Sequence, residues 1–122
     1  MNQQFGKKDR LKSKKLIDKL FVEGKSVKSY PLKLVYTSFD NSEKPELKTG
    51  VSVPKKLVKT AVARNRIKRL MREVFRKNKY LVNNQISTSY ALMFIYISRE
   101  EISYDKLEKC MIKTLEQFID KN

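Results

Sequence analysis

The sixteen residues AVARNRIKRLMREVFR, at positions 61–76, carry the strongest signal for fold and function in this chain of 122 residues. At about 100° per residue, their apolar side chains share one face of an α-helix, with the spacing i, i+3, i+4, i+7 and i+8. These side chains are Ile67, Leu70, Met71, Val74 and Phe75. Polar side chains gather on the opposite face, flanked by Arg64 and Arg66: Asn65, Lys68, Arg69, Arg72 and Arg76. The pattern predicts a long helix between Leu57 and Tyr80 that docks its apolar face and presents cations to solvent.

The charge of the chain is concentrated around this helix. The chain has 28 Lys and Arg, 13 Asp and Glu and no His, for a formal net charge of +15. Residues 54–79 contain eleven bases and one acid, Glu73, and residues 7–28 carry a further +6. A merely solvated helix face mixes both signs of charge, because like charges on neighbouring turns repel each other. The distribution therefore favours nucleic acid as the partner, ahead of an anionic membrane surface.

The segments around this helix predict a single small α+β domain over residues 1–122. We expect a helix from Ser13 to Glu23, stopped by Gly24, and a final helix capped by Ser103. Strands are expected at Leu32–Phe39, Thr49–Val53 and Ser89–Ser98, and the polar segment 40–46 predicts a hairpin loop between the first two. The resulting order is α-β-β-α-β-α, a two-layer α/β sandwich with room for an extra short strand. Residues 1–9 are expected to be flexible.

Several classes of function are excluded by what the sequence lacks. The absence of His removes the commonest general base, and the single cysteine, Cys110, excludes an intramolecular disulfide and a Cys-cluster zinc site. We expect Cys110 to be a buried small hydrophobe without a redox role. No pair of acids lies inside the basic segment, where Glu73 is expected to be a local charge partner. We therefore predict no catalytic residue and no metal ligand in this chain. The absence of a long apolar run favours a cytoplasmic protein that does not span a membrane. We expect no obligate protein partner.

The basic helix belongs to a longer sequence motif that begins before the helix. Gly50-Val51-Ser52-Val53-Pro54-Lys55-Lys56 is followed, after seven residues, by RNRIKRLMRE at positions 64–73. This combination resembles the bacterial ribonuclease P protein subunit. The segment Arg10-Leu11-Lys12 and the short helix that ends in Leu20-Phe21 before Gly24 are similar to that family as well, so the resemblance covers most of the chain.

The resemblance implies a protein cofactor for a catalytic RNA that, with bound Mg²⁺, removes the 5′ leader of precursor tRNA. It implies that the Arg-Asn-Arg helix lies in a left-handed crossover between parallel strands. The residues that would face the RNA subunit are Arg64, Asn65, Arg66, Lys68, Arg69, Arg72 and Arg76, with Arg10 and Lys12 as further basic residues. A second surface, between the first helix and the sheet, would take the single-stranded leader. Its expected residues are Phe21, Tyr36, Ile17, Lys55 and Lys56, and Ile17 stands where many relatives carry an aromatic side chain.

Two other interpretations of the residues stay open at this point. A structural ribosomal or rRNA-binding protein without an enzymatic role would use a basic amphipathic helix equally well. A DNA-binding regulator would need a turn and a second helix before the basic helix, where residues 49–53 predict a strand instead. For Phe21, ordinary packing in the core is the alternative to contact with the leader.

Overall fold

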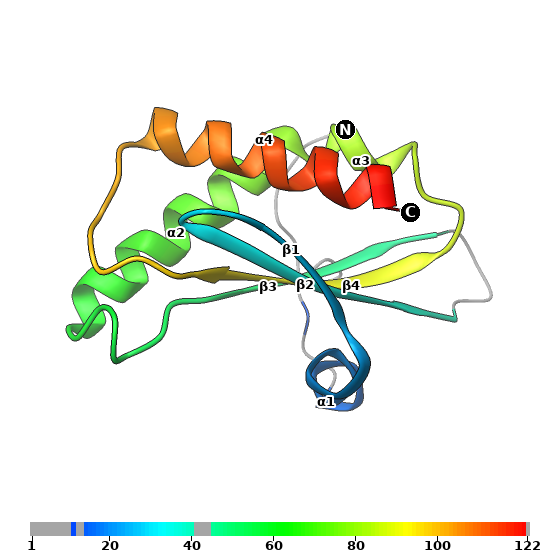
Figure 1. Cartoon of the computed structure of the whole chain (residues 1–122), viewed down its shortest axis with the longest axis horizontal. Helices are drawn as coiled ribbons and strands as arrows, with labels where there is room; N and C mark the ends of the chain where they lie inside the picture. Colours follow the sequence, from blue (N-terminus) through cyan, green and yellow to red (C-terminus); the bar gives the residue numbers. More distant parts are fainter. Residues whose placement is uncertain (1–10, 12–13, 41–44, 122) are drawn as a thin grey trace.

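A four-stranded sheet forms the centre of the molecule, with its strands in the order β1-β2-β4-β3 (Figure 1). The computed structural model describes Leu11, residues 14–40 and residues 45–121. Its elements are α1 (Lys14–Glu23), β1 (Lys25–Ser29), β2 (Leu32–Phe39), β3 (Leu47–Ser52), α2 (Ala61–Asn78), α3 (Tyr80–Asn83), β4 (Ser89–Tyr96) and α4 (Tyr104–Lys121). The predicted α+β class is confirmed, and β1 is the extra short strand. The one-turn helix α3 was not predicted. Residues 1–9 and Ser13 lie outside the described residues.

The connection from β2 to β3 is not a hairpin, and that prediction is wrong. β2 pairs antiparallel with β1 and β4, whereas β3 pairs parallel with β4 at the edge of the sheet. The sequence of β4, SYALMFIY, has apolar side chains on both faces, so this strand gains most from the central position. The sequence of β3, LKTGVS, places polar residues on one face, which an edge strand tolerates. The parallel pairing puts α2 in the crossover from β3 to β4.

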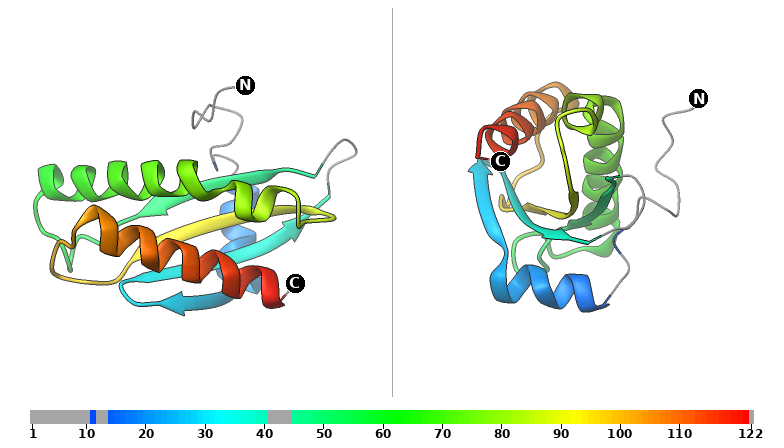
Figure 2. Two further views of the ribbon diagram at one scale, coloured as in Figure 1. Left: turned by 90° about the horizontal axis from the view of Figure 1, so that it is seen from above. Right: turned by 90° about the vertical axis from the view of Figure 1, so that its right-hand side faces the viewer.

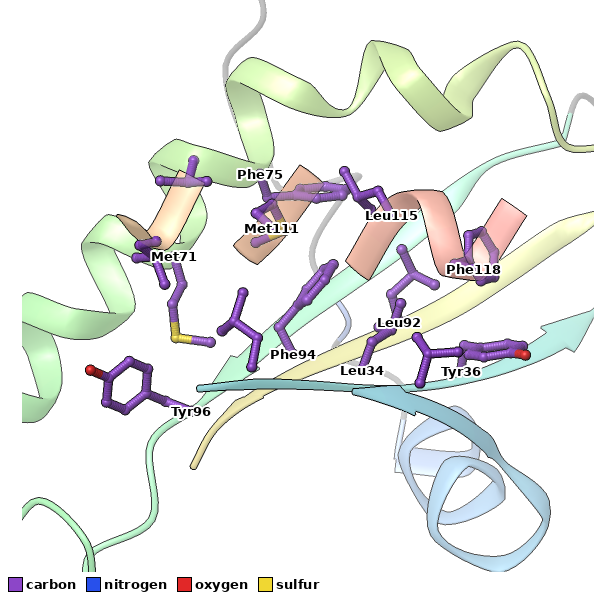
Figure 3. Packing of buried hydrophobic residues seen from close by; sticks show 14 of the residues in the cluster. Leu34, Tyr36, Met71, Phe75, Leu92, Phe94, Tyr96, Met111, Leu115 and Phe118 are labelled. Atoms are coloured by element: carbon purple, nitrogen blue, oxygen red, sulfur yellow. The ribbon is translucent and has the colours of Figure 1, made fainter. Parts of the chain in front are cut away.

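The two faces of the sheet carry different helices. α2 and α4 cover one face, and α1 crosses the other (Figures 1 and 2). On the α2 and α4 side, Leu34 of β2 lies opposite Phe94 of β4, and both are buried with Phe75, Met111 and other apolar side chains (Figure 3). The main core therefore lies between the sheet and the layer formed by α2 and α4. α1 adds the buried Leu20 on the other side.

The ends of the helices follow from local interactions. Thr60 caps α2, because its Oγ1 accepts a hydrogen bond of 3.2 Å from the Ala63 N–H. Ser103 caps α4 in the same way, as predicted, through a 3.3 Å bond from the Lys106 N–H. Gly24 ends α1 at a close approach: a Cβ there would lie 2.2 Å from the Leu20 carbonyl oxygen and 2.8 Å from Val35 Cγ1. Only glycine therefore fits between the end of α1 and β2.

Two neighbouring residues of α4, Cys110 and Met111, differ in burial. In α4, Met111 fills the buried core position, while Cys110 is only half-buried, with its Sγ 3.3 Å from the Tyr30 carbonyl oxygen. Cys110, expected to be buried, is therefore only partly buried against the core, because the neighbouring methionine takes the inward direction. Within the described ranges, each helix is too short or too polar to cross a lipid bilayer.

Candidate nucleic-acid interface

The basic helix packs as its sequence pattern predicts. Ile67, Met71, Val74 and Phe75 are buried in the core, and Leu70 at the edge of this stripe is half-buried. Tilted aromatic packing joins α2 to the sheet, since the rings of Phe75 and Phe94 lie 5.3 Å apart between centroids. With one face fixed in this way, the opposite face of α2 necessarily points to solvent.

Three arginines of α2 already engage groups of the protein. Arg64 Nη1 donates hydrogen bonds to the carbonyl oxygens of Val58 and Lys59, at 3.0 and 2.9 Å. Arg66, whose side chain is 57% exposed, forms an ion pair of 3.3 Å with Glu101 in the segment before α4. Arg76 donates two hydrogen bonds to Glu73 one turn away.

The Arg76–Glu73 pair has a defined charge state at neutral pH. The hydrogen bond from the Arg76 guanidinium lowers the pKa of the Glu73 carboxyl below its usual range, against an opposing effect of burial. The same hydrogen bond raises the pKa of Arg76. Both groups are therefore charged, and Glu73 pairs with a neighbouring arginine, as the sequence predicts. The pair offsets part of the positive charge at this end of α2.

Three of the remaining polar residues on the exposed face of α2 have side chains without a partner in the described part of the chain. Asn65 and Arg69 are exposed and Lys68 is half-buried, and none of the three side chains has a hydrogen bond or ion pair to the part of the chain that the structure describes. Arg72 is half-buried. Lys55 and Lys56 are exposed in the loop directly before α2. We call these six residues the basic surface: Lys55, Lys56, Asn65, Lys68, Arg69 and Arg72.

A second candidate surface lies on the opposite face of the sheet, beside α1. Phe21 is 66% exposed, so its alternative as a core residue is wrong, and Ile17 one turn earlier is half-buried. α1 crosses the sheet near Val35 and Ser38, where Lys19 Nζ donates to the Ser38 carbonyl at 2.8 Å. We call Ile17 and Phe21, together with three partly exposed strand residues on the same side of the sheet, the α1-side face. Its strand residues are Lys33, Met93 and Ile95, each half-buried.

Tyr36 was expected on the surface that takes the leader, but it is buried and does not belong to the α1-side face. The residue is 2% exposed and its ring packs edge-on against Phe118 of α4, at 4.9 Å between centroids (Figure 3). A ring buried in this way is not available to stack on a base. Side chains alternate along a strand, so Tyr36 shares the core face with Leu32 and Leu34. That alternation was visible in the sequence and also points to the residues that were missed, Lys33, Met93 and Ile95.

The predicted residues thus fall into two separate groups. α2 holds the residues expected to face an RNA subunit, whereas Ile17 and Phe21, expected to bind the leader, lie on α1 beneath the sheet (Figure 2). Lys55 and Lys56, also expected to bind the leader, lie instead in the loop directly before α2. Arg10 and Lys12 lie outside the described residues. Among the residues that the structure describes, no group of three or more His, Cys, Asp or Glu side chains is placed to hold a metal ion.

Comparisons with known proteins agree with this fold and with the motif. The family model of ribonuclease P matches residues 5–119. The ribonuclease P protein component of Porphyromonas gingivalis is 38% identical over 112 residues, covering 89% of this chain and 82% of the relative. That of Vibrio cholerae is 34% identical over 103 residues, covering 84% and 81%.

Solved structures show the same architecture. The ribonuclease P protein of Staphylococcus aureus superposes with a TM-score of 0.70 at 24% identity, covering 89% of this chain and 94% of that one. The protein of Thermotoga maritima gives a TM-score of 0.70 at 23% identity, covering 88% and 96%. A structural ribosomal protein is not favoured by these matches. The chain therefore belongs to the ribonuclease P protein family, the protein component of an endoribonuclease complex that processes tRNA.

Proposed function

We propose that this chain binds the catalytic RNA of ribonuclease P through the basic surface and the 5′ leader of precursor tRNA through the α1-side face. One observation carries the proposal. α2 packs its apolar face into the core, with only Leu70 at its edge half-buried, while the side chains of Asn65, Lys68 and Arg69 stand on its other face without a partner among the described residues. A helix that leaves such side chains unpaired beside further lysines suits a polyanion.

The chemistry of the basic surface suits folded RNA. Arginine presents a planar fork of donors that matches two phosphate oxygens, and lysine adds mobile point charges. Each neutralised phosphate releases condensed counterions, which is a large part of the affinity of such complexes. Asn65 stands between the cations and can both donate and accept, so it suits a 2′-hydroxyl or a base edge.

The α1-side face suits single-stranded RNA. The exposed ring of Phe21 offers a stacking surface for an unpaired base, and Ile17, Met93 and Ile95 add apolar contact. Lys33 on the same face can track the backbone phosphates.

Cleavage itself is assigned in this proposal to the RNA subunit. Mg²⁺ held by that RNA would supply the nucleophile and stabilise the leaving oxygen. The chain lowers the repulsion between the two RNAs and aligns the leader, and it does so in the cytoplasm. None of its residues is assigned an acid, base or nucleophilic role.

Reconstitution tests the proposed function. The chain is mixed with a bacterial ribonuclease P RNA and precursor tRNA at low Mg²⁺, and removal of the 5′ leader is followed on a gel. We expect the rate to rise well above that of the RNA alone. No gain in rate, or cleavage by the protein without RNA, would refute the proposal.

Variants of Phe21 test the second surface in the same assay. Replacing Phe21 with Ala should weaken binding of precursor tRNA that has a leader of several nucleotides, because stacking contributes about 1–3 kcal/mol per base. With a leader of a single nucleotide the same substitution should have little effect. Equal losses for both substrates would remove the leader from the α1-side face.

A further inference from the structure

The loop between β3 and α2, residues 53–60, carries two of the cations of the basic surface but little regular structure. The N–H groups of Leu57 and Val58 both donate to the Pro54 carbonyl, at 3.1 Å each, and form a turn. Val53 and Val58 are buried, whereas Lys55 and Lys56 are exposed. The loop therefore has apolar anchors near each end and a solvent-facing pair of lysines between them.

Arg64 ties this loop to the helix. Its side chain runs back toward the start of α2, the direction that helical side chains favour, and Nη1 donates to two successive carbonyls, those of Val58 and Lys59. Its own N–H donates to the Thr60 carbonyl at 3.0 Å. Arg64 is thus bonded to three consecutive residues of the loop.

The environment of Arg64 differs from that of Arg66 and Arg76. Those two arginines are paired with the carboxylates of Glu101 and Glu73. Arg64 is half-buried, and the guanidinium donates to neutral carbonyl oxygens, which orient it without cancelling its charge. Carbonyls at the end of a loop would otherwise be satisfied by water, and the loop would be freer to move.

We propose that Arg64 is a positioning residue, which holds the Lys55–Lys56 loop against α2 so that both lysines bind RNA together with Asn65, Lys68 and Arg69. This inference rests on the proposed function, because it assigns Arg64 a role in the same RNA site. Holding the loop in place before binding removes part of the entropic cost of ordering it on the RNA. Arg64 therefore acts through other residues, even though it belongs to the Arg-Asn-Arg motif.

The first test uses the free protein. Amide hydrogen exchange of Leu57 and Val58 is measured by NMR in the unmodified chain and in Arg64→Ala. Exchange should be roughly tenfold faster in the variant, as expected for the loss of charge-assisted hydrogen bonds at a half-buried site. Arg69→Ala, which removes the same charge from the same helix, should leave both amides unchanged. Unchanged exchange in a folded Arg64→Ala protein would overturn the inference.

The second test measures coupling in RNA binding. Affinity for a bacterial ribonuclease P RNA is determined for Arg64→Ala, for the double variant Lys55→Ala/Lys56→Ala, and for their combination. If Arg64 positions the lysines, the loss caused by the double variant should be roughly fivefold smaller in the Arg64→Ala background. In the Arg69→Ala background the loss should be the same as in the unmodified chain. Additive losses with Arg64→Ala would mean that Arg64 contacts RNA independently, and would overturn the inference.

The conservative variant Arg64→Lys separates charge from geometry, and replaces Arg64→Ala if that protein does not fold. An ammonium keeps the charge but lacks the planar fork. We expect affinity to recover only partly and exchange at Leu57 and Val58 to stay raised. Full recovery of affinity with the loop still mobile would overturn the positioning role. Failure of the unmodified chain to bind the RNA would refute the proposed function instead, and the exchange test would still report on the loop.

Discussion

The salt dependence of RNA binding is the most direct measure of how α2 is used. We consider the double variant Lys68→Ala/Arg69→Ala, because neither side chain has a hydrogen bond or ion pair to the described residues. Removing surface side chains of this kind changes the free energy of unfolding by less than about 0.5 kcal/mol each. Any large effect on RNA binding therefore reports on contacts with RNA and not on the fold.

The expected magnitude follows from counterion release. Each phosphate contact contributes about 0.7 to 0.9 to the slope of log affinity against log salt, depending on whether the RNA is single- or double-stranded. Loss of two contacts should flatten the slope by about 1.4 to 1.8. Over a fourfold range of salt, the unmodified chain should thus lose about 7 to 12 times more affinity than the variant.

Affinity for a bacterial ribonuclease P RNA is measured by filter binding at several salt concentrations. The control is Lys109→Ala/Lys113→Ala, which removes the same charge from exposed positions on α4. The control should change the slope by less than half as much, because only long-range attraction is lost. An unchanged slope for Lys68→Ala/Arg69→Ala, or equal changes for both variants, would show that the basic surface does not contact phosphates.

Three further predictions concern the stability and electrostatics of the fold. Phe118→Ala should destabilise the protein by about 3–5 kcal/mol in urea unfolding, because the ring is buried against Tyr36, whereas Phe21→Ala at its exposed position should cost less than about 0.5 kcal/mol. Gly24→Ala should cost about 1–3 kcal/mol, because its Cβ would lie 2.2 Å from the Leu20 carbonyl oxygen; Gly50→Ala, whose nearest neighbour is the flexible end of Met93 at 3.2 Å, should cost less in the same assay. The carboxyl of Glu73 should titrate by NMR below the usual pKa of glutamate. Its pairing with Arg76 is therefore present at neutral pH and is lost as the pH falls through that lowered pKa. In Arg76→Ala the pKa of Glu73 should return toward its usual value, and an unchanged pKa would contradict the assignment.

Local sequence determined the elements and the faces of the helices. The apolar spacing in residues 61–76 predicts a helix with one buried face. The structure contains this helix as α2, and its apolar face packs into the core. Ser103 lies three residues before the N–H that it caps, so its role depended on nearby residues alone. The motif that joins Lys55–Lys56 to the Arg-Asn-Arg segment is also local, which is why the family could be recognised before the fold was known.

The tertiary structure decided the features that depend on residues far apart in the chain. The hairpin expected after β2 was wrong because β4, about fifty residues later, takes the place beside β2. The direction of Tyr36 was set by the side of the sheet on which α4 packs. The pairing of Arg66 arose in the same way, since Glu101 lies 35 residues from it in the sequence. Periodicity fixes which residues share a face, but only the packing of distant segments fixes which face is buried and which cations remain free to bind RNA.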